Sequence, residues 1–153
     1  MPAYLDIETS YEGVITVIGL LRPSGDLAQW VNPAINPAEL LESLSGAQAL
    51  YTYNGHRFDL PFIHRRLGLN LRRLVPCRDL MYECWRRDLY GGLKAVERKL
   101  GVRRSLPDLN GRDAMRLWAA YMERGEEEAL TMLLQYNRED VENLALLRAR
   151  LFD

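Results

Sequence analysis

Two acidic side chains occupy alternate positions of an apolar N-terminal segment. Asp6 and Glu8 lie in LDIET, and because side chains alternate across a β-strand, both carboxylates point to the same face. Neighbouring carboxylates repel each other and are costly to remove from water. A fold tolerates them when a cation lies between them, and hard oxygen ligands favour Mg²⁺ or Mn²⁺ over zinc. The alternatives are a solvated edge strand or a turn role for Glu8.

A further acidic residue lies on the apolar stripe of the predicted C-terminal helix. At about 100° per residue, Asp140 falls inside this stripe, whereas Glu139 falls on the opposite side. The stripe consists of Leu133, Leu144, Leu147 and Leu151. Tyr136 is one turn before Asp140, so the two side chains can meet. An inward-facing charge needs a partner, and a cation or its water is favoured. The alternatives are a buried arginine, a helix N-terminus, or a break near Asn137.

Asp59 lies in YNGHRFDLPFI, between a predicted strand and a predicted helix. Aspartate is a good N-cap residue and Pro61 suits the first helical turn, so an ordinary cap is the favoured interpretation of Asp59 alone. The functional interpretation is that the C-terminal end of the strand delivers Asp59 to a cleft, where open α/β sheets bind their ligands.

The elements that position these residues follow from apolar periodicity and from glycine and proline. Strands are expected at 3–9, 14–22, 27–31, 49–54 and around 74–77. Helices are expected at 37–44, 60–69, 79–87, 93–101, 112–124 and 126–151, with a loop at 105–111. The first two strands form an antiparallel hairpin, and the fourth is a buried parallel strand. This order indicates one α/β domain, residues 1–153, with a mixed sheet.

Composition and charge narrow the class of protein. The 153 residues are 48% apolar and 27% charged, which is typical of a soluble globular domain. No apolar run approaches the roughly 18 residues of a membrane span, and a cytoplasmic location is expected. Cys77 and Cys84 lack paired spacing, so free thiols are expected. The net charge is −1, but the arginine-rich middle third suits a phosphate backbone, and solvated helix faces explain it equally well.

Together, the acidic segments resemble the DEDD superfamily of 3′–5′ exonucleases, in the subclass that uses tyrosine. The first motif is matched by Asp6 and Glu8 in LDIET, and the second by Asp59 in YNGHRFDLPFI. The third motif, in YNREDVENL, is matched by Tyr136 four residues before Asp140. The pattern is similar to the proofreading domains of B-family DNA polymerases and to small stand-alone relatives.

The spacing of the third motif distinguishes the subclass. The related histidine subclass places its histidine five residues before the aspartate, where this chain has Gln135. The resemblance spans residues 4–147, and although a D-x-E match is weak by itself, the three motifs at these spacings are specific jointly.

The resemblance implies a ribonuclease-H-like fold, a five-stranded mixed sheet with one antiparallel strand and helices on both sides. It implies two divalent cations, Mg²⁺ or Mn²⁺. Asp6 would bridge them, Glu8 and Asp140 would complete one, and Asp59 would hold the other. Tyr136 and Glu8 would orient the attacking water. The implied reaction removes nucleoside 5′-monophosphates from the 3′ end of single-stranded DNA or RNA.

Substrate contacts are expected at four further residues: Asn54, Phe58, Phe62 and Lys94. Phe58 and Phe62 could stack on the terminal base, since unpaired bases offer π-faces. Packing in the core is the alternative for both phenylalanines and the favoured one for Phe58. Asn54 could contact the terminal nucleotide or serve a turn. Lys94 lies near a helix N-terminus that could receive a phosphate, or it belongs to an ordinary helix start.

Three other functions are consistent with these residues. One is a ribonuclease that trims RNA 3′ ends, because one or two polar contacts suffice to read a 2′-hydroxyl. Another is a catalytically silent nucleic-acid-binding or scaffolding module, which the intact set of carboxylates disfavours. The last is the proofreading subunit of a polymerase assembly.

Overall fold

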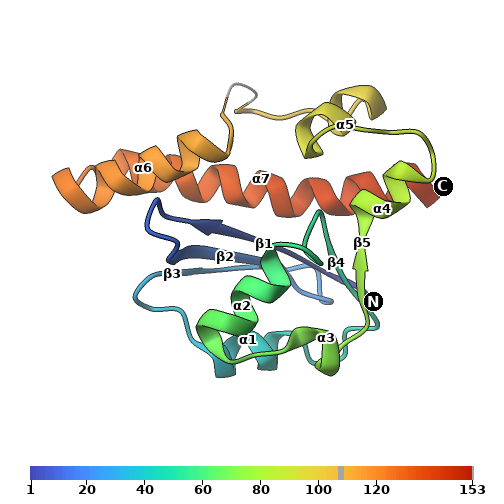
Figure 1. Ribbon diagram of the computed structural model, residues 1–153, viewed down its shortest axis with the longest axis horizontal. Helices are drawn as coiled ribbons and strands as arrows, with labels where there is room; N and C mark the ends of the chain where they lie inside the picture. The colour runs from blue at the N-terminus through green and yellow to red at the C-terminus, as the bar shows by residue number, and fades with distance from the viewer. Residues whose placement is uncertain (107–108, 153) are drawn as a thin grey trace.

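The computed structural model describes residues 1–106 and 109–152, which form one central sheet between two layers of helices (Figure 1). The strands are β1 Ala3–Thr9, β2 Ile15–Leu21, β3 Leu27–Val31, β4 Leu50–Thr52 and β5 Cys77–Asp79. The helices are α1 Pro37–Ser43, α2 Asp59–Leu67, α3 Leu71–Leu74, α4 Leu80–Trp85, α5 Leu93–Leu100, α6 Gly111–Arg124 and α7 Glu127–Phe152.

The sheet has five strands in the order β3-β2-β1-β4-β5. β2 is antiparallel to both of its neighbours, whereas β1, β4 and β5 are mutually parallel. This arrangement confirms the predicted mixed sheet with one antiparallel strand. It also places β1 in the centre, so the interpretation of its acidic pair as part of a solvated edge strand is wrong.

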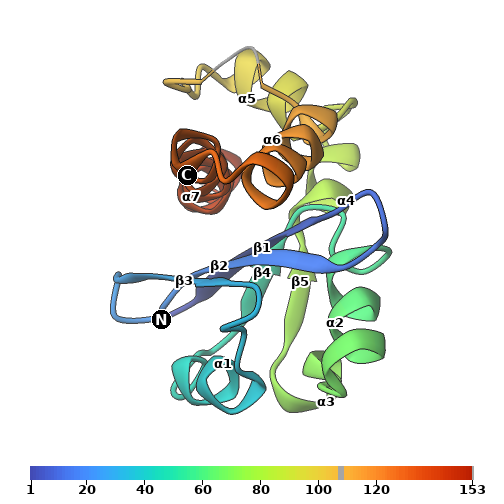
Figure 2. The same cartoon turned by 90° about the vertical axis from the view of Figure 1, so that its left-hand side faces the viewer.

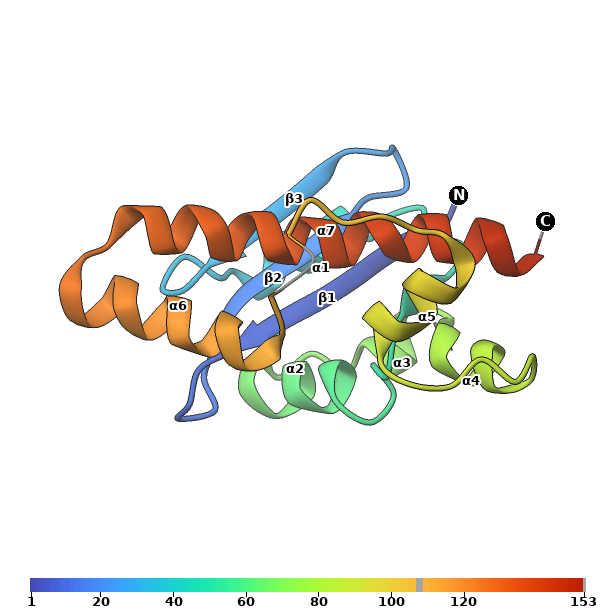
Figure 3. The same cartoon turned by 90° about the horizontal axis from the view of Figure 1, so that it is seen from above.

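The two helical layers cover opposite faces of the sheet (Figures 1 and 2). α1, α2 and α3 lie on one face, and α5, α6 and α7 lie on the other. The view from above shows α7 crossing the sheet over β1 and β2, with α6 running beside it (Figure 3). A helix laid across the central strand can bring its side chains to that strand from directly above.

The alternation of β1 divides the core between these layers. Leu5 and Ile7 pack in one cluster with Ile63 of α2. Tyr4, on the opposite face of β1, packs in a second cluster with Leu144 of α7. The even-numbered face of β1, which carries its two carboxylates, therefore faces α7.

Most predicted elements agree with the structure, with one displaced strand. The strand expected around 74–77 is wrong in position, because residues 71–74 close a helical turn in which Val75 N donates to Leu71 O at 3.0 Å. Pairing with β4 begins only at Cys77. The predicted loop at 105–111 lies partly on residues 107 and 108, outside the described residues. Both cysteines are free, as predicted.

Gly19 of β2 permits the close approach of α7 to the sheet. It lies opposite Asp6, and a Cβ at this position would lie 2.2 Å from Asn137 Oδ1 and 2.9 Å from Val141 Cγ2. We therefore expect Gly19→Ala to lower the free energy of unfolding by about 1–3 kcal/mol, because α7 must shift away from the sheet. Chemical denaturation followed by circular dichroism measures this loss.

Gly92→Ala is the matched control. Its added Cβ would have nothing within 4 Å, and its backbone φ of −72° suits any residue. Equal unfolding free energies for the two variants would show that the contact between Gly19 and α7 is not a tight one.

Candidate active site

Three carboxylates from two elements converge at the interface of the sheet and α7. Asp6 and Glu8 come from β1, and Asp140 comes from α7. One carboxylate oxygen of each lies within 4.8 Å of the others. The convergence joins residues more than 130 positions apart in the sequence.

A network of amides supports this cluster from α7. Asn137 Nδ2 donates to Asp6 O at 3.2 Å and to Asp6 Oδ2 at 3.4 Å. Asn137 Oδ1 accepts from Gln29 Nε2 at 3.0 Å, and the same Gln29 nitrogen donates to Leu134 O at 2.9 Å. Asp6 is therefore fixed through its neighbour on α7.

The carboxylates are costly for the protein to keep charged. Burial, with the nearby charge of Asp140, raises the pKa of Glu8 to about 8. Burial raises the pKa of Asp6 well above its usual range, and the charges of Asp140 and Glu8 add to the effect. The pKa of Asp140 is also raised by burial, although Arg104 opposes the shift. Each effect favours a neutral carboxyl unless a cation is supplied.

The donor atoms suit a divalent cation. Glu8 Oε1 is buried, and among the described residues it has no hydrogen-bond partner. An unpaired carboxylate oxygen beside two other carboxylates is the oxygen-rich arrangement that Mg²⁺ and Mn²⁺ prefer. The geometry therefore fits a bound metal, which Asp6, Glu8 and Asp140 could hold.

Asp59 lines the same cavity as Asp6, Glu8 and Asp140 but is positioned by a different element. It is the first residue of α2, and its Oδ2 accepts from Ile7 N of β1 at 3.0 Å. The preference for an N-cap role is wrong, because the cap position is Phe58 and makes no side-chain cap bond. Burial raises the pKa of Asp59 to about 7, although the bond from Ile7 lowers it. One oxygen of Asp59 thus joins α2 to β1.

The loop before Asp59 is held by a residue that the sequence analysis missed. Asp79, buried at the end of β5, accepts from Asn54 N at 2.8 Å, from His56 N at 3.3 Å and from Met81 N at 3.0 Å. Asn54 adopts a left-handed φ of 61° and lines the cavity. Its Oδ1 is buried and has no partner among the described residues. The position of Asp79 between a predicted strand and a predicted helix was the sequence signal that could have indicated its capping role.

The two phenylalanines have different environments. Phe58 is 41% exposed and lines the cavity, so its assignment to the core is wrong. Its position on the loop before α2 directs the ring outward. Phe62 lies one turn later, with its ring centroid 5.3 Å from that of Phe58, and packs against the core. It does not line the cavity that holds the carboxylates.

Tyr136 and Lys94 meet beside the acidic cluster. Lys94 Nζ lies 3.3 Å from the Tyr136 hydroxyl and 4.5 Å from the ring centroid. Burial, with the charge of Asp140, raises the pKa of Tyr136 above its usual range. Burial and the nearby Arg104 lower the pKa of Lys94. The tyrosine therefore stays protonated at neutral pH and can donate a hydrogen bond, but it is unsuited to act as a base.

Arg104 is another residue of the site that sequence reasoning did not identify. Its Nη2 contacts Asp140 Oδ1, and Nη2 and Nε both contact Glu97 of α5. A buried arginine was an alternative partner for Asp140, and the structure contains it. Burial alone would lower the pKa of Arg104, but these carboxylates outweigh it and raise the pKa. Arg104 lies in the loop after α5, and no local sequence pattern indicates that it contacts Asp140.

Glu139, the neighbour of Asp140, is buried although it lies off the apolar stripe. The helical projection places it away from the apolar stripe, yet it is buried and accepts from Ser105 N at 2.8 Å. The segment after α5 covers this side of α7 and supplies the donor. The α7 helix continues through Asn137 without a break, so the stripe argument for Asp140 holds.

Two adjoining cavities surround the acidic cluster. One, of about 310 Å³, is lined by Asp6, Glu8, Asp59 and Asp140 among others. The other, of about 280 Å³, shares Asp6, Tyr136 and Asp140 and adds Lys94 and Arg104. The first of these cavities thus combines four carboxylates with exposed Phe58 at its margin.

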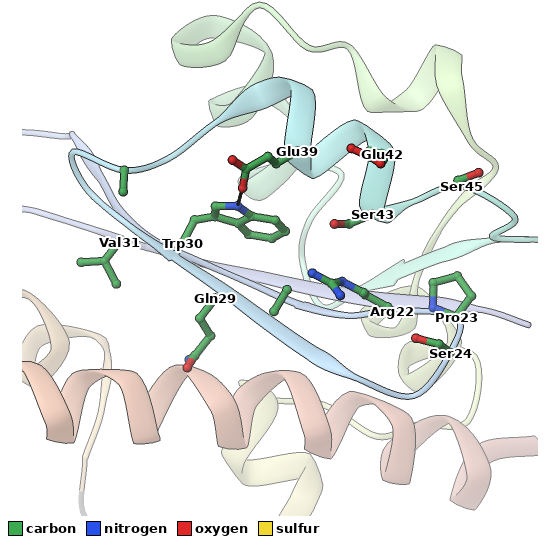
Figure 4. A pocket seen from close by; sticks show the side chains of 12 residues that line it. Arg22, Pro23, Ser24, Gln29, Trp30, Val31, Glu39, Glu42, Ser43 and Ser45 are labelled. Carbon is green, nitrogen blue, oxygen red and sulfur yellow. Dashed lines mark hydrogen bonds between the residues drawn. The ribbon is translucent and has the colours of Figure 1, made fainter.

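A larger cavity lies elsewhere. It measures about 980 Å³ and opens between β3 and α1, where Trp30 and Arg22 point into it while Gln29 points to α7 (Figure 4). Trp30 Nε1 donates to Glu39 there at 3.1 Å, so that carboxylate already has a partner. Within the part of the chain that the structure describes, three carboxylates converge at Asp6, Glu8 and Asp140 and not in this larger cavity, so the smaller acidic cavity is the candidate active site.

The fold and the acidic cluster together define a nuclease-type enzyme. The model of the RNase H superfamily matches residues 3–152, and this chain belongs to that superfamily. The expectation of a ribonuclease-H-like protein is therefore confirmed. The cluster of Asp6, Glu8 and Asp140 could hold a divalent cation, which is consistent with nucleases of this superfamily.

Comparison with solved structures shows the same fold. The family B DNA polymerase from the hyperthermophilic archaeon Pyrobaculum calidifontis is similar, with a TM-score of 0.74 and 16% sequence identity. The match covers 97% of this chain and 24% of the polymerase chain. No curated protein matches this chain. Within the described residues, no helix is both long and apolar enough to cross a membrane.

Proposed function

We propose that this chain is a metal-dependent 3′–5′ exonuclease that removes nucleoside 5′-monophosphates from DNA or RNA. The observation that carries the proposal is the convergence, within 4.8 Å, of Asp6 and Glu8 of the central strand β1 with Asp140 of α7, in a ribonuclease-H-like fold. The tyrosine of the third motif lies one turn away on the same helix. Similarity to a polymerase chain is consistent with a nucleic-acid substrate.

Two divalent cations, Mg²⁺ or Mn²⁺, are the proposed cofactors. Asp6, Glu8 and Asp140 would hold one, and Asp6 with Asp59 would hold the second. When bound, such cations activate the attacking water and stabilise the departing oxygen. The structure shows one Asp59 oxygen bonded to Ile7 N, which leaves the other oxygen for this role.

The remaining groups of the site bind and orient. The protonated Tyr136 hydroxyl donates to the attacking water, and Lys94 keeps that hydroxyl in place through its 3.3 Å contact. Lys94 also brings positive charge to the side of the cavity that receives the phosphate. Exposed Phe58 stacks on the terminal base, and buried Asn54 Oδ1 accepts from the terminal nucleotide. Phe62 supports the Phe58 ring.

The size of the cavity favours an end of a strand as substrate. About 310 Å³ is at the small end of the range for ligand sites and accommodates roughly one nucleotide, such as the unpaired terminal nucleotide of a strand. A cytoplasmic location and association with a polymerase remain predictions.

Labelled oligonucleotides test the proposal. Single-stranded DNA and RNA, each labelled at the 5′ or the 3′ end, are incubated with Mg²⁺, Mn²⁺ or EDTA. We expect a 3′ label to be released as a mononucleotide and a 5′-labelled strand to shorten stepwise. No reaction is expected in EDTA. Asp140→Asn should abolish the reaction, whereas Glu142→Gln, on the exposed face of α7, should not. Binding without cleavage under every condition would identify a silent module instead.

Tyr136→Phe isolates the tyrosine hydroxyl. We expect turnover to fall about 10- to 100-fold, because the attacking water loses one orienting donor while the carboxylates are untouched. Mn²⁺ affinity, measured by isothermal titration calorimetry, should stay within about threefold of the wild type.

Tyr121→Phe is the control for this variant, because Tyr121 packs beside Trp118 and lines neither of the two cavities at the acidic cluster. Wild-type turnover in Tyr136→Phe would remove the hydroxyl from the mechanism. A parallel loss of Mn²⁺ affinity would assign it to the metal site.

A further inference from the structure

Asp140 contacts Arg104, which in turn forms an ion pair with Glu97. Arg104 Nη2 contacts Asp140 Oδ1 and lies 2.6 Å from Glu97 Oε1, while Arg104 Nε lies 2.7 Å from Glu97 Oε2. The guanidinium thus engages Glu97 with two nitrogens and Asp140 with one. Such a two-nitrogen contact fixes the plane of the guanidinium.

The pair is almost completely enclosed. The exposed fractions of the side chains are 4% for Arg104 and 2% for Glu97, against 10% for Asp140. Asn143 of α7 donates to Glu97 Oε2 at 3.0 Å and so fixes the acid from the same helix that carries Asp140. Removal of two charges from water is costly, so a role in the site is a reason to retain them.

The net charge of Arg104 and Glu97 determines how this ion pair affects cation binding at the acidic cluster. An arginine without a counter-ion would neutralise Asp140 and repel divalent cations from the cluster. Glu97 balances Arg104, so the pair adds no net charge to the carboxylates of Asp6, Glu8 and Asp140. The contact to Oδ1 leaves Asp140 Oδ2 free of the arginine.

We propose that Arg104 and Glu97 form a charge-neutral clamp, in which Arg104 orients Asp140 and Glu97 keeps the arginine from cancelling the charge that binds the metal. Both are positioning residues. This inference rests on the metal site of the proposed function. It assigns a role to two residues outside the DEDD pattern.

Mn²⁺ binding separates the two roles of the clamp. Glu97→Gln leaves Arg104 with an unbalanced charge, and we expect Mn²⁺ affinity to fall about tenfold or more in calorimetric titration. The double variant Glu97→Gln with Arg104→Met removes both charges and should return the affinity to within about threefold of the wild type. Its turnover should stay low, because nothing then orients Asp140.

Arg104→Lys keeps the charge but loses the planar two-nitrogen contact. We expect Mn²⁺ affinity near that of the wild type and a turnover about tenfold lower. Circular dichroism and thermal melting in EDTA establish that each variant is folded. If Glu97→Gln does not fold, the comparison of Arg104→Lys with the double variant still tests the orientation of Asp140.

The outcomes are distinct. Wild-type affinity in folded Glu97→Gln, or wild-type turnover in Arg104→Lys, would overturn the clamp. The single variant Arg104→Met should turn over more slowly than the wild type, because nothing then orients Asp140. Higher Mn²⁺ affinity together with higher turnover in this variant would show that the arginine competes with the metal, which also overturns the clamp. If the wild type itself shows no Mn²⁺ binding that depends on Asp6, the proposed function fails rather than the clamp.

Discussion

Asp6→Asn is expected to lower exonuclease turnover about a thousandfold or more. Asp6 is one of the carboxylates that would hold the cations. The asparagine side chain has neither the negative charge nor the second ligand oxygen of the aspartate. The loss of several kcal/mol of charge stabilisation corresponds to a factor of this size. Release of mononucleotides from a 3′-labelled strand, measured at saturating Mg²⁺, gives the turnover.

The same substitution should stabilise the protein when no metal is present. It removes one of the mutually repelling buried carboxylates, so we expect the melting temperature in EDTA to rise by a few degrees. Asp26→Asn, on an exposed turn, is the control and should change neither quantity. Activity within tenfold of the wild type in Asp6→Asn would exclude Asp6 from the metal site.

Stability of the metal-free protein should fall as the pH rises. The pKa of Glu8 is raised from 4.5 to about 8 and that of Asp59 from 3.8 to about 7, mainly by burial. The folded state therefore binds more protons than the unfolded state between about pH 4 and pH 8, so the free energy of unfolding decreases with pH across this window. In EDTA, we expect a melting temperature roughly 5–10 °C lower at pH 8.5 than at pH 5.5.

Saturating Mn²⁺ should reverse this dependence, because bound cations favour the ionised carboxylates and stabilise the folded state more at pH 8.5 than at pH 5.5. Glu8→Gln should flatten the EDTA profile, since it removes one of the two carboxyl groups whose pKa is raised by burial. A metal-free melting temperature that is unchanged or rises across this window would contradict the burial of these carboxylates in a shared site.

The fold was predictable because its signals are local. The period of two in residues 3–9 identifies the strand and the face that carries its carboxylates. The leucine stripe of the last helix identifies the inward face that carries Asp140. The structure buries Glu8 and Asp140 and leaves Asp6 half-buried. The displaced strand before α4 shows the limit, because a strand of three residues is determined by its neighbour β4 rather than by its own pattern.

The parts of the site that sequence analysis missed depend on contacts between distant segments. Arg104 reaches Asp140 from 36 residues away, and Asp59 accepts from a backbone nitrogen 52 residues away instead of capping its own helix. Phe58 looks like a core residue in FDLPFI, but α2 begins directly after it and turns its ring outward. No spacing in the chain encodes these contacts.

The hydrogen bonds that link Leu134 O, Gln29, Asn137 and Asp6 can form with only one arrangement of donors and acceptors. Leu134 O can only accept, so the Gln29 amide must offer its NH₂ group inward, and Asn137 must then turn its oxygen to Gln29 and its own NH₂ to Asp6. A main-chain carbonyl on α7 and a side chain on β3 thereby dictate that Asp6 always faces a donor. The peripheral strand of the sheet thus helps to orient a carboxylate on the central strand.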